Sequence, residues 1–419
     1  MKIFAKKFAG LENLRTFAIP NGENTEFFEE KCGNSSVGRA QPCQGWGREF
    51  ESRFPLQGGR LNAALNFETP DVVQLYAGRP LLRSAFFYLC IQYRLYNIEQ
   101  AMIKKTIITA AILAVAAVSG CAQNQKPVYK ADSNPIFTHK YTCDPAAMVE
   151  GNTLWLFTGQ DVAGNQTGYH LTDWCAFSTT DMVNWTEHPT PLKSTDFAWN
   201  VTNDAWAAHV TERNGKYYYY ISTSGAGIGV AVSDRPEGPY KDALGKPLLT
   251  KADCEGADHD WVCIDPAVFI DDDGQAYIFW GNRYCYYAKL KENMIEIEGE
   301  ITKLEFDPRW PFTEAAWVHK ANGKYYLTYA CTWPEKIAYA MADSIHGPWE
   351  FKGLLSECAG NCNTTHPAIV ELNGKTYFFT HNGTLPEGTS YSRSVCVEEV
   401  IYNPDGTMQK CDVTTEGIW

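Results

Sequence analysis

The sequence has little positive charge for its length. Its 419 residues contain 36 Lys and Arg against 49 Asp and Glu, which gives a formal net charge of −13. A protein that binds nucleic acid needs a basic stripe or patch, and this chain has none. We therefore expect no nucleic-acid partner and favour a neutral or small substrate.

Long apolar runs are also scarce. The exception is residues 103–121, where a Lys pair precedes an apolar run that ends in Val118-Ser119-Gly120-Cys121. This order is typical of a secretory signal peptide. Its ending resembles a bacterial lipobox, in which Cys121 is lipidated and becomes the mature N-terminus. The run is shorter than the roughly 18–20 residues of a membrane span. We therefore predict a lipoprotein signal peptide at 102–121 rather than a transmembrane helix. The protein would be exported and meet a membrane, the outer one, only through its lipid anchor.

Residues 1–101 lack any sustained period of 2 or 3.6 residues. Within them, residues 34–55 resemble the frame translation of a transfer-RNA gene. Because a signal peptide acts only at the start of a chain, we interpret Met102 as the true start and expect residues 1–101 to form no domain. A genuine leader of unknown role is the alternative. Residues 102–419 then hold 24 Lys and Arg against 39 Asp and Glu, a net charge of −15.

Ten cysteines follow Cys121. Export permits disulfides, and two pairs are close enough in sequence to join locally: Cys254 with Cys263, and Cys358 with Cys362. Cys143, Cys263, Cys285 and Cys331 stand in apolar strand patterns, where a thiol is simply a small buried hydrophobe. Zinc at Cys358, Cys362 and His366 lacks an evident fourth ligand, so we do not favour it.

Five stretches of the chain repeat one pattern, a short apolar strand, a Gly- or Asn-containing turn and an aromatic strand. The five openings are Asp144-Pro-Ala-Ala-Met-Val, Trp206-Ala-Ala-His-Val, Asp265-Pro-Ala-Val-Phe-Ile, Glu314-Ala-Ala-Trp-Val and His366-Pro-Ala-Ile-Val. The aromatics eleven or twelve residues later are Trp155, Tyr217, Tyr277, Tyr325 and Tyr377. A hairpin repeated about every fifty to sixty residues predicts propeller blades.

The repeat therefore predicts an all-β fold, a five-bladed β-propeller over residues 136–419, preceded by a polar tether at 122–135. Equivalent positions of propeller blades converge on the central channel. Asp144, Asp265, Glu314 and His366 should consequently meet there, and three carboxyls with one imidazole form a candidate active site.

Glycoside hydrolysis with inversion needs one carboxylate as the base for water and one carboxylic acid for the leaving oxygen. A third carboxylate nearby raises the pKa of the acid, because like charges penalise ionisation. Asp144, Asp265 and Glu314 supply this set. Alternatively, Asp144 and Asp265 only initiate turns, because Asp often does so before a Pro. Their shared position in the repeat argues against this interpretation.

Three motifs resemble glycoside hydrolase family 43. They are Cys143-Asp144-Pro145, Ile264-Asp265-Pro266 followed by Asp-Asp-Asp-Gly274, and Phe312-Thr313-Glu314-Ala315 followed by Asn-Gly-Lys-Tyr-Tyr326. The resemblance covers about Tyr141 to Gly406. It implies a five-bladed propeller and an inverting enzyme that removes arabinofuranosyl or xylosyl residues from plant cell-wall glycans. By motif, it implies Asp144 as general base, Glu314 as general acid and Asp265 as the residue that positions the acid and tunes its pKa.

The remaining candidates surround this set. Trp206 shares the repeat position and should form a wall of the sugar subsite, whereas Asn282 and Arg393 are candidates to bind sugar hydroxyls or the acid. The family often places a His beside a calcium ion on the axis, so His366 is a candidate for the pocket and for a structural metal. No cofactor is expected for the chemistry itself. The alternative interpretations are structural. Trp206 would be an ordinary core residue, His366 a core histidine with its hydrogen bonds satisfied, and Asn282 and Arg393 would support the fold or lie at the surface.

The chain departs from the family pattern at two places, and three other functions remain as alternatives. Trp206-Ala-Ala-His209 lacks the Pro usual in the family, and Ala315 stands where many relatives have Gly. An endo-acting arabinanase, a non-catalytic glycan-binding propeller and a retaining fructosidase are the competing functions. The fructosidase is disfavoured because the chain has no Arg-Asp-Pro motif.

Overall fold

The computed structural model describes residue 88 and residues 91–106, 126–200, 202 and 204–419. The chain divides into two units, residues 1–112 and 113–419. In the first unit the described residues, 88 and 91–106, are helical; residues 102–106 of this helix belong to the predicted signal peptide. Within the described part of the chain, no helix has the length and apolar character needed to cross a membrane. Cys121 lies outside the described residues, so lipidation stays a prediction.

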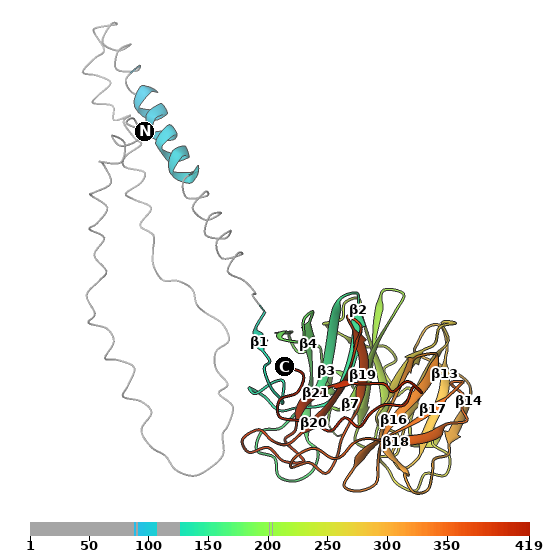
Figure 1. The fold of residues 1–419 in the computed structure, drawn as a ribbon. Coiled ribbons are helices and arrows are strands. Elements are labelled where there is room, and N and C mark those ends of the chain that lie inside the picture. The colour runs from blue at the N-terminus through green and yellow to red at the C-terminus, as the bar shows by residue number, and fades with distance from the viewer. Residues whose placement is uncertain (1–87, 89–90, 107–125, 201, 203) are drawn as a thin grey trace, which may run out of the picture. The chain divides into compact units, whose positions relative to one another are not determined.

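The second unit consists of five antiparallel sheets (Figure 1). The first sheet has the order β1-β5-β4-β3-β2, with β6 beside β4; its strands are β1 Val128–Lys130, β2 Thr142–Glu150, β3 Thr153–Asp161, β4 Leu171–Thr179, β5 Asn184–Glu187 and β6 Leu192–Lys193. The second has the order β10-β9-β8-β7, with β7 Trp206–Arg213, β8 Lys216–Thr223, β9 Gly227–Ser233 and β10 Lys241–Asp242.

The other three sheets follow in chain order. The third runs β11-β12-β13-β14, with β11 Ala267–Ile270, β12 Ala276–Trp280, β13 Cys285–Leu290 and β14 Ile297–Leu304. The fourth runs β15-β16-β17-β18, with β15 Phe312–Ala321, β16 Lys324–Cys331, β17 Lys336–Ala342 and β18 Glu350–Ser356. The fifth runs β19-β20-β21, with β19 Ala368–Leu372, β20 Lys375–Asn382 and β21 Ser394–Val400. Two short 3₁₀ turns, Ser194–Asp196 and Lys251–Asp253, lie between strands. The predicted five-bladed propeller is confirmed.

Each blade begins with the hairpin that the repeat predicted. Three of the hairpins turn through Asn-Gly pairs, and both residues of each pair have positive φ: Asn214-Gly215, Asn322-Gly323 and Asn373-Gly374. Asn and Gly are the residues that adopt this conformation most readily, and such turns match the twist of paired strands. The predicted aromatics all lie on the second strand of their hairpin and are buried. These turns therefore fix the register of the innermost strands.

The ring closes where the start of the propeller meets its last blade. The Asn134 amide oxygen accepts from the backbone N–H of Val397, and its Nδ2 donates to the carbonyl of the same residue. The N–H of Ile136 donates to the carbonyl of Val395. β1 already pairs with β5 at Val128–Lys130. The ordered propeller thus begins before residue 136, so the predicted tether of 122–135 is too long at its C-terminal end.

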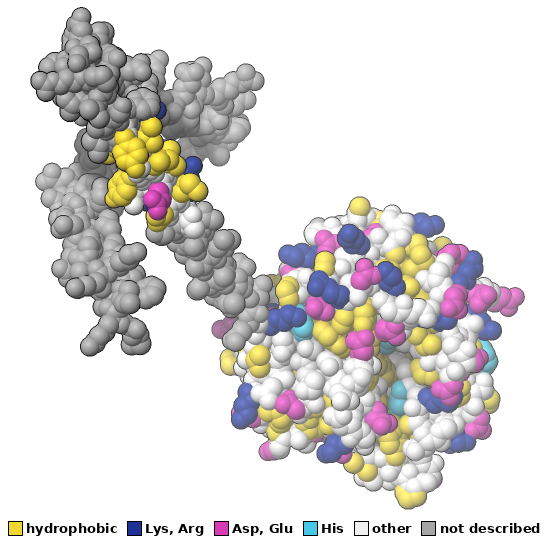
Figure 2. Space-filling model, turned by 90° about the horizontal axis from the view of Figure 1, so that it is seen from above, with side chains coloured by type: hydrophobic (Ala, Val, Ile, Leu, Met, Phe, Trp, Pro, Cys, Tyr) yellow, Lys and Arg dark blue, Asp and Glu magenta, His cyan; other side chains and the backbone are white. Residues whose placement is uncertain are grey.

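The core lies between blades and is rich in aromatic rings. Trp174, Trp185, Trp280, Tyr219 and Tyr326 are among the largest fully buried side chains. The ten cysteines in residues 126–419 all carry free thiols; Cys143, Cys285 and Cys331 are buried in strands as predicted, whereas Cys263 is buried outside any strand. On the face shown in Figure 2, acidic and basic side chains are interspersed around a central hollow, without a broad basic patch among the described residues.

Candidate active site

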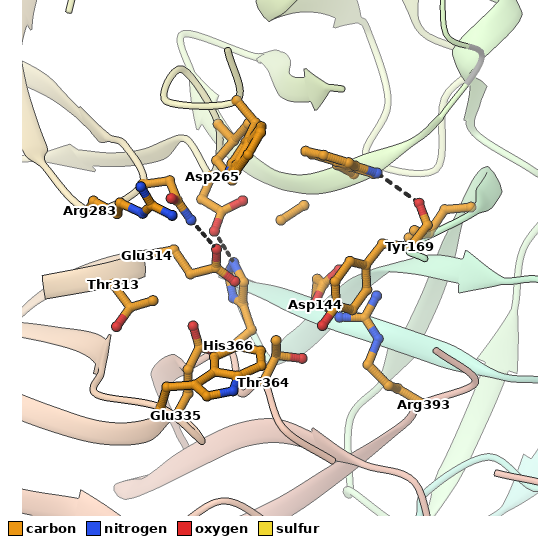
Figure 3. Close-up of a pocket in the computed structure, with 17 residues that line it drawn as sticks. Asp144, Tyr169, Asp265, Arg283, Thr313, Glu314, Glu335, Thr364, His366 and Arg393 are labelled. Carbon is orange, nitrogen blue, oxygen red and sulfur yellow. Dashed lines mark hydrogen bonds and ion pairs between the residues drawn. The ribbon is translucent and has the colours of Figure 1, made fainter. Parts of the chain in front are cut away.

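A pocket of about 400 Å³ holds every residue that the sequence singled out for chemistry or sugar binding. Its lining includes Asp144, Trp206, Asp265, Asn282, Glu314, His366 and Arg393. Four of these come from equivalent places, because Asp144 and Glu314 lie near the start of β2 and β15 while Asp265 and His366 just precede β11 and β19. The predicted convergence of distant segments is therefore present (Figure 3).

Local backbone irregularities aim the carboxyls into the pocket. Asp144 and Asp265 have positive φ values of 46° and 55°, a conformation that Asp tolerates better than most residues. The β2–β3 register shifts between Cys143 and Ala146, and the β15–β16 register shifts on both sides of Glu314. Such bulges redirect single side chains and are common beside active sites.

Asp144 lies in a cationic setting. Arg393 Nη1 donates to its Oδ1 at 2.7 Å, and its backbone N–H donates to His381 Nδ1 at 3.3 Å. His381 Nε2 in turn donates to the carbonyl of Thr364 at 3.2 Å. Burial alone would raise the pKa of Asp144, but the charge of the Arg393 guanidinium outweighs it and the pKa is lowered. Asp144 is therefore ionised at neutral pH.

Arg393 is held by a second carboxylate, Asp161 at the end of β3. The Arg393 Nε and Nη2 donate to the two oxygens of Asp161 at 2.9 and 3.0 Å, and the Arg393 backbone N–H donates at 2.8 Å. A bidentate pair of this kind fixes the plane of the guanidinium. Arg393 therefore lies on the Asp144 side of the pocket. Its side chain bonds to Asp144 and Asp161 and not to Glu314, the predicted acid.

Glu314 and Asp265 have the opposite electrostatics. Burial, followed by the negative charge of Asp144, raises the pKa of Glu314 to about 7. Burial and the charge of Glu314 raise the pKa of Asp265 well above its ordinary range. Asp265 Oδ2 accepts from the backbone N–H of Ala315 at 3.1 Å, directly beside Glu314. One pocket therefore contains an ionised carboxylate and a carboxyl group that stays protonated up to neutral pH.

Asn282 and Trp206 line the pocket by different means. Asn282 Nδ2 donates to Glu314 Oε2 at 2.6 Å, so this residue contacts the predicted acid. Trp206 is half-buried, and its Nε1 donates to the carbonyl of Tyr169 at 3.0 Å. This bond holds the indole at the pocket wall, where a sugar face can stack on it.

His366 reaches the pocket, but the structure does not complete a metal site around it. Both ring nitrogens are buried without a hydrogen-bond partner, Nε2 lies 4.0 Å from Asp265 Oδ2, and burial lowers the pKa of His366 to about 4. Calcium takes six to eight oxygen ligands. Among the described residues no group of three or more His, Cys, Asp or Glu is placed to hold a metal ion. A calcium ion beside His366 would need water for most of its ligands, and the structural metal stays a prediction.

The pocket lining also includes residues that the sequence analysis did not single out, among them Tyr169, Trp261, Trp333 and Glu335. The indoles of Trp261 and Trp333 are 45% and 63% exposed, which is unusual for Trp and suits a rim that meets sugar. Glu335 is 1% exposed; its Oε2 accepts from the N–H of Thr365 at 3.0 Å while Oε1 has no partner. Glu335 lies on the Glu314 side of the pocket, away from Asp144 and Arg393 (Figure 3).

An ionised carboxylate and a protonated carboxyl in one pocket are the pair that glycoside hydrolases use. Residues 133–408 match the family described as "Glycosyl hydrolases family 43". The chain is 32% identical over 332 residues to the xylosidase/arabinosidase 43A of Humicola insolens, which covers 65% of this chain and 97% of that protein. It is 31% identical over 328 residues to the xylosidase/arabinosidase of Bacteroides ovatus, covering 66% and 95%.

Solved structures agree with these relatives. A family 43 β-xylosidase/α-arabinofuranosidase from a compost microbial metagenome, crystallised with xylotriose in a calcium-free form, superposes with a TM-score of 0.61 at 28% identity, covering 68% of this chain and 99% of that one. An α-L-arabinofuranosidase from Clostridium thermocellum gives a TM-score of 0.57 at 36% identity, covering 67% and 97%. The chain belongs to glycoside hydrolase family 43 and is a glycoside hydrolase.

Proposed function

We propose that the protein removes terminal arabinofuranosyl or xylosyl residues from plant cell-wall glycans or their oligosaccharides, with inversion at the anomeric carbon. Asp144 acts as the base that activates water, Glu314 protonates the leaving oxygen, and Asp265 positions the acid by accepting from the backbone N–H beside Glu314. The relatives named for xylosidase and arabinosidase activity support the substrate class.

The observation that carries the proposal is the opposite protonation of two carboxyls in one pocket. Arg393 keeps Asp144 ionised, whereas burial and Asp144 raise the pKa of Glu314 to about 7. An inverting glycosidase needs this division of a base from an acid. The opposite assignment, with Glu314 as the base and Asp144 as the acid, would need each group in its less stable protonation state.

The chemistry can be written with the residues present. Asp144 takes a proton from a water as the water oxygen bonds to the anomeric carbon. The bond between that carbon and the leaving oxygen breaks, and Glu314 delivers its proton to this oxygen. Glu314 leaves the step ionised and Asp144 leaves it protonated, so solvent must restore both groups before the next turnover. His366 is neutral and offers its free ring nitrogens to the sugar or to a water.

The test is hydrolysis of a panel of p-nitrophenyl glycosides: β-D-xylopyranoside, α-L-arabinofuranoside and β-D-galactofuranoside. The last is included because an Aspergillus niger relative, 31% identical over 307 residues, is named a β-D-galactofuranosidase. We expect release from a pentoside, with kcat/KM falling above about pH 7, where Glu314 ionises.

A substitution links the activity to the site. Glu314→Gln should lower kcat on xylobiose or arabinobiose by about 10²–10⁴-fold while sugar binding persists. Glu371→Gln, at an exposed carboxylate on β19, is the matched control and should have wild-type rates. Binding of pentosides or arabinan by the wild-type protein without any hydrolysis would favour the glycan-binding alternative. Release of internal fragments from linear arabinan would favour an endo-acting arabinanase.

A further inference from the structure

A chain of hydrogen bonds leads from Glu314 out of the pocket. Asn282 Nδ2 donates to Glu314 Oε2 at 2.6 Å, and Asn282 Oδ1 lies 3.1 Å from His259 Nε2. His259 Nδ1 lies 2.9 Å from Asp258 Oδ1. His259 and Asn282 are each 7% exposed, whereas the Asp258 side chain is 65% exposed. The chain therefore joins the buried carboxyl to a carboxylate at the surface.

These bonds specify which oxygen of Glu314 bears the proton. Oε2 accepts a short bond from an amide N–H, so the proton for the leaving group resides on Oε1. This arrangement holds only while the nitrogen end of the Asn282 amide faces Glu314. The other end of that amide, Oδ1, meets His259 Nε2. A ring N–H at that position selects the orientation of the amide that suits the acid.

The His259 ring is fixed on several sides. Both ring nitrogens of His259 face oxygen acceptors, Asp258 Oδ1 at Nδ1 and Asn282 Oδ1 at Nε2. The Trp261 ring packs against His259 with centroids 5.0 Å apart at 63°. The backbone N–H of Asn282 donates to the carbonyl of Val262 at 3.0 Å. The loop at 258–262 thus has little freedom relative to the end of β12.

We infer that His259 is a positioning residue for the acid: acting through Asn282, it fixes the rotamer of Glu314 and the oxygen that delivers the proton. The inference rests on the proposed function, because it presumes that Glu314 is the acid. A purely structural His259 would support the loop at 258–262 and affect all substrates equally.

The leaving group separates these two roles. A 2,4-dinitrophenolate departs without a proton, whereas a sugar hydroxyl needs one, so only the second reaction depends on the placement of Glu314. For His259→Ala we expect kcat on the disaccharide of the preferred pentose to fall about tenfold or more. The 2,4-dinitrophenyl glycoside of the same sugar should lose less than about twofold, and KM for it should stay near the wild-type value.

Matched variants control for folding. His188→Ala removes another buried His with two side-chain partners, Ser178 and Lys126, outside the pocket lining; it should slow both substrates equally or neither. His259→Gln retains an N–H that reaches Asn282 Oδ1 and should recover part of the disaccharide rate. If His259→Ala does not fold, Asn282→Ala provides the same comparison, and with both variants in hand the double mutant should lose no more than the worse single one.

Equal losses on both substrates for His259→Ala and Asn282→Ala, or no loss on either, would overturn the inference. Failure of the proposed function is a different result: the wild-type protein would then hydrolyse neither the disaccharide nor the activated glycoside of any pentose.

Discussion

Removal of the Arg393 charge should damage stability and catalysis in separable ways. Arg393 is 3% exposed and donates to Asp161 through Nε and Nη2 and to Asp144 through Nη1. Both carboxylates are buried, at 3% and 8% exposure. Methionine keeps an unbranched apolar stem but leaves both charges without the guanidinium. Breaking a buried ion pair by removing one partner costs about 3–5 kcal/mol, so Arg393→Met should lower Tm by about 10 °C.

The catalytic effect follows from the pKa of Asp144. Loss of an adjacent opposite charge raises the pKa of a carboxyl by about 1–3 units. In the wild-type protein the lowered pKa of Asp144 contributes stability that is present above the ordinary value of 3.8 and is lost as pH falls through the lowered value. In Arg393→Met this contribution to stability disappears. The acid limb of the kcat/KM profile should move to higher pH by about 1–3 units, because it follows the pKa of the base, Asp144.

Calorimetry and a pH–rate profile measure the two effects independently. Arg213→Met is the control, because Arg213 pairs with Glu292, whose side chain is 78% exposed, and such surface pairs contribute about 0–1 kcal/mol. Arg393→Met combined with Asp161→Asn removes one of the two unpaired charges, so it should recover part of the Tm while the acid limb stays displaced. An Arg393→Met protein with wild-type Tm and an unmoved acid limb would refute the reasoning.

Substitutions at three further positions test other parts of the structure. Ala315 is fully buried with φ of 60°. Ala315→Gly should therefore change stability by less than about 1 kcal/mol, whereas Ala315→Val, β-branched in a left-handed conformation, should cost about 2 kcal/mol or more; urea unfolding distinguishes them, and similar values for both would contradict the assigned backbone. Burial and the charge of Glu314 raise the pKa of Glu335 well above 4.5. The stability that protonated Glu335 provides is present below about 4.5 and is lost as pH rises toward the raised value, so the Tm of Glu335→Gln relative to wild type should increase between pH 5 and pH 8, and a difference independent of pH would count against a protonated Glu335. Cys121→Ala should move the protein from the membrane to the soluble fraction if Cys121 carries the lipid, and unchanged fractionation would end the lipoprotein interpretation.

The fold was predictable because one local pattern recurs five times. Each opening is followed at nearly the same spacing by an apolar strand, a turn and an aromatic strand, and Asn-Gly turns specify the register of three of those hairpins. Convergence of Asp144, Asp265, Glu314 and His366 then follows from the symmetry of a propeller. No knowledge of side-chain packing is required for this step.

The partners of these residues were not predictable, because nothing local encodes them. Asp161 meets Arg393 across 232 positions of sequence, and the sequence shows only a polar residue at the end of an apolar strand. Glu335 stands in Trp333-Pro-Glu-Lys336, which is typical of an exposed turn, yet its carboxyl is buried through a contact with Thr365. The start of the ordered propeller was misplaced for the same reason, since β1 pairs with a strand more than fifty residues later.

The stereochemistry of hydrolysis tests the central claim most directly. Proton NMR of the first product released from the preferred pentoside, recorded before mutarotation, reports the configuration of the anomeric carbon. A base at Asp144 and an acid at Glu314, with water as the nucleophile, predict a first product of inverted configuration. A first product with retained configuration would mean that a protein group attacks the sugar and would contradict the assigned roles.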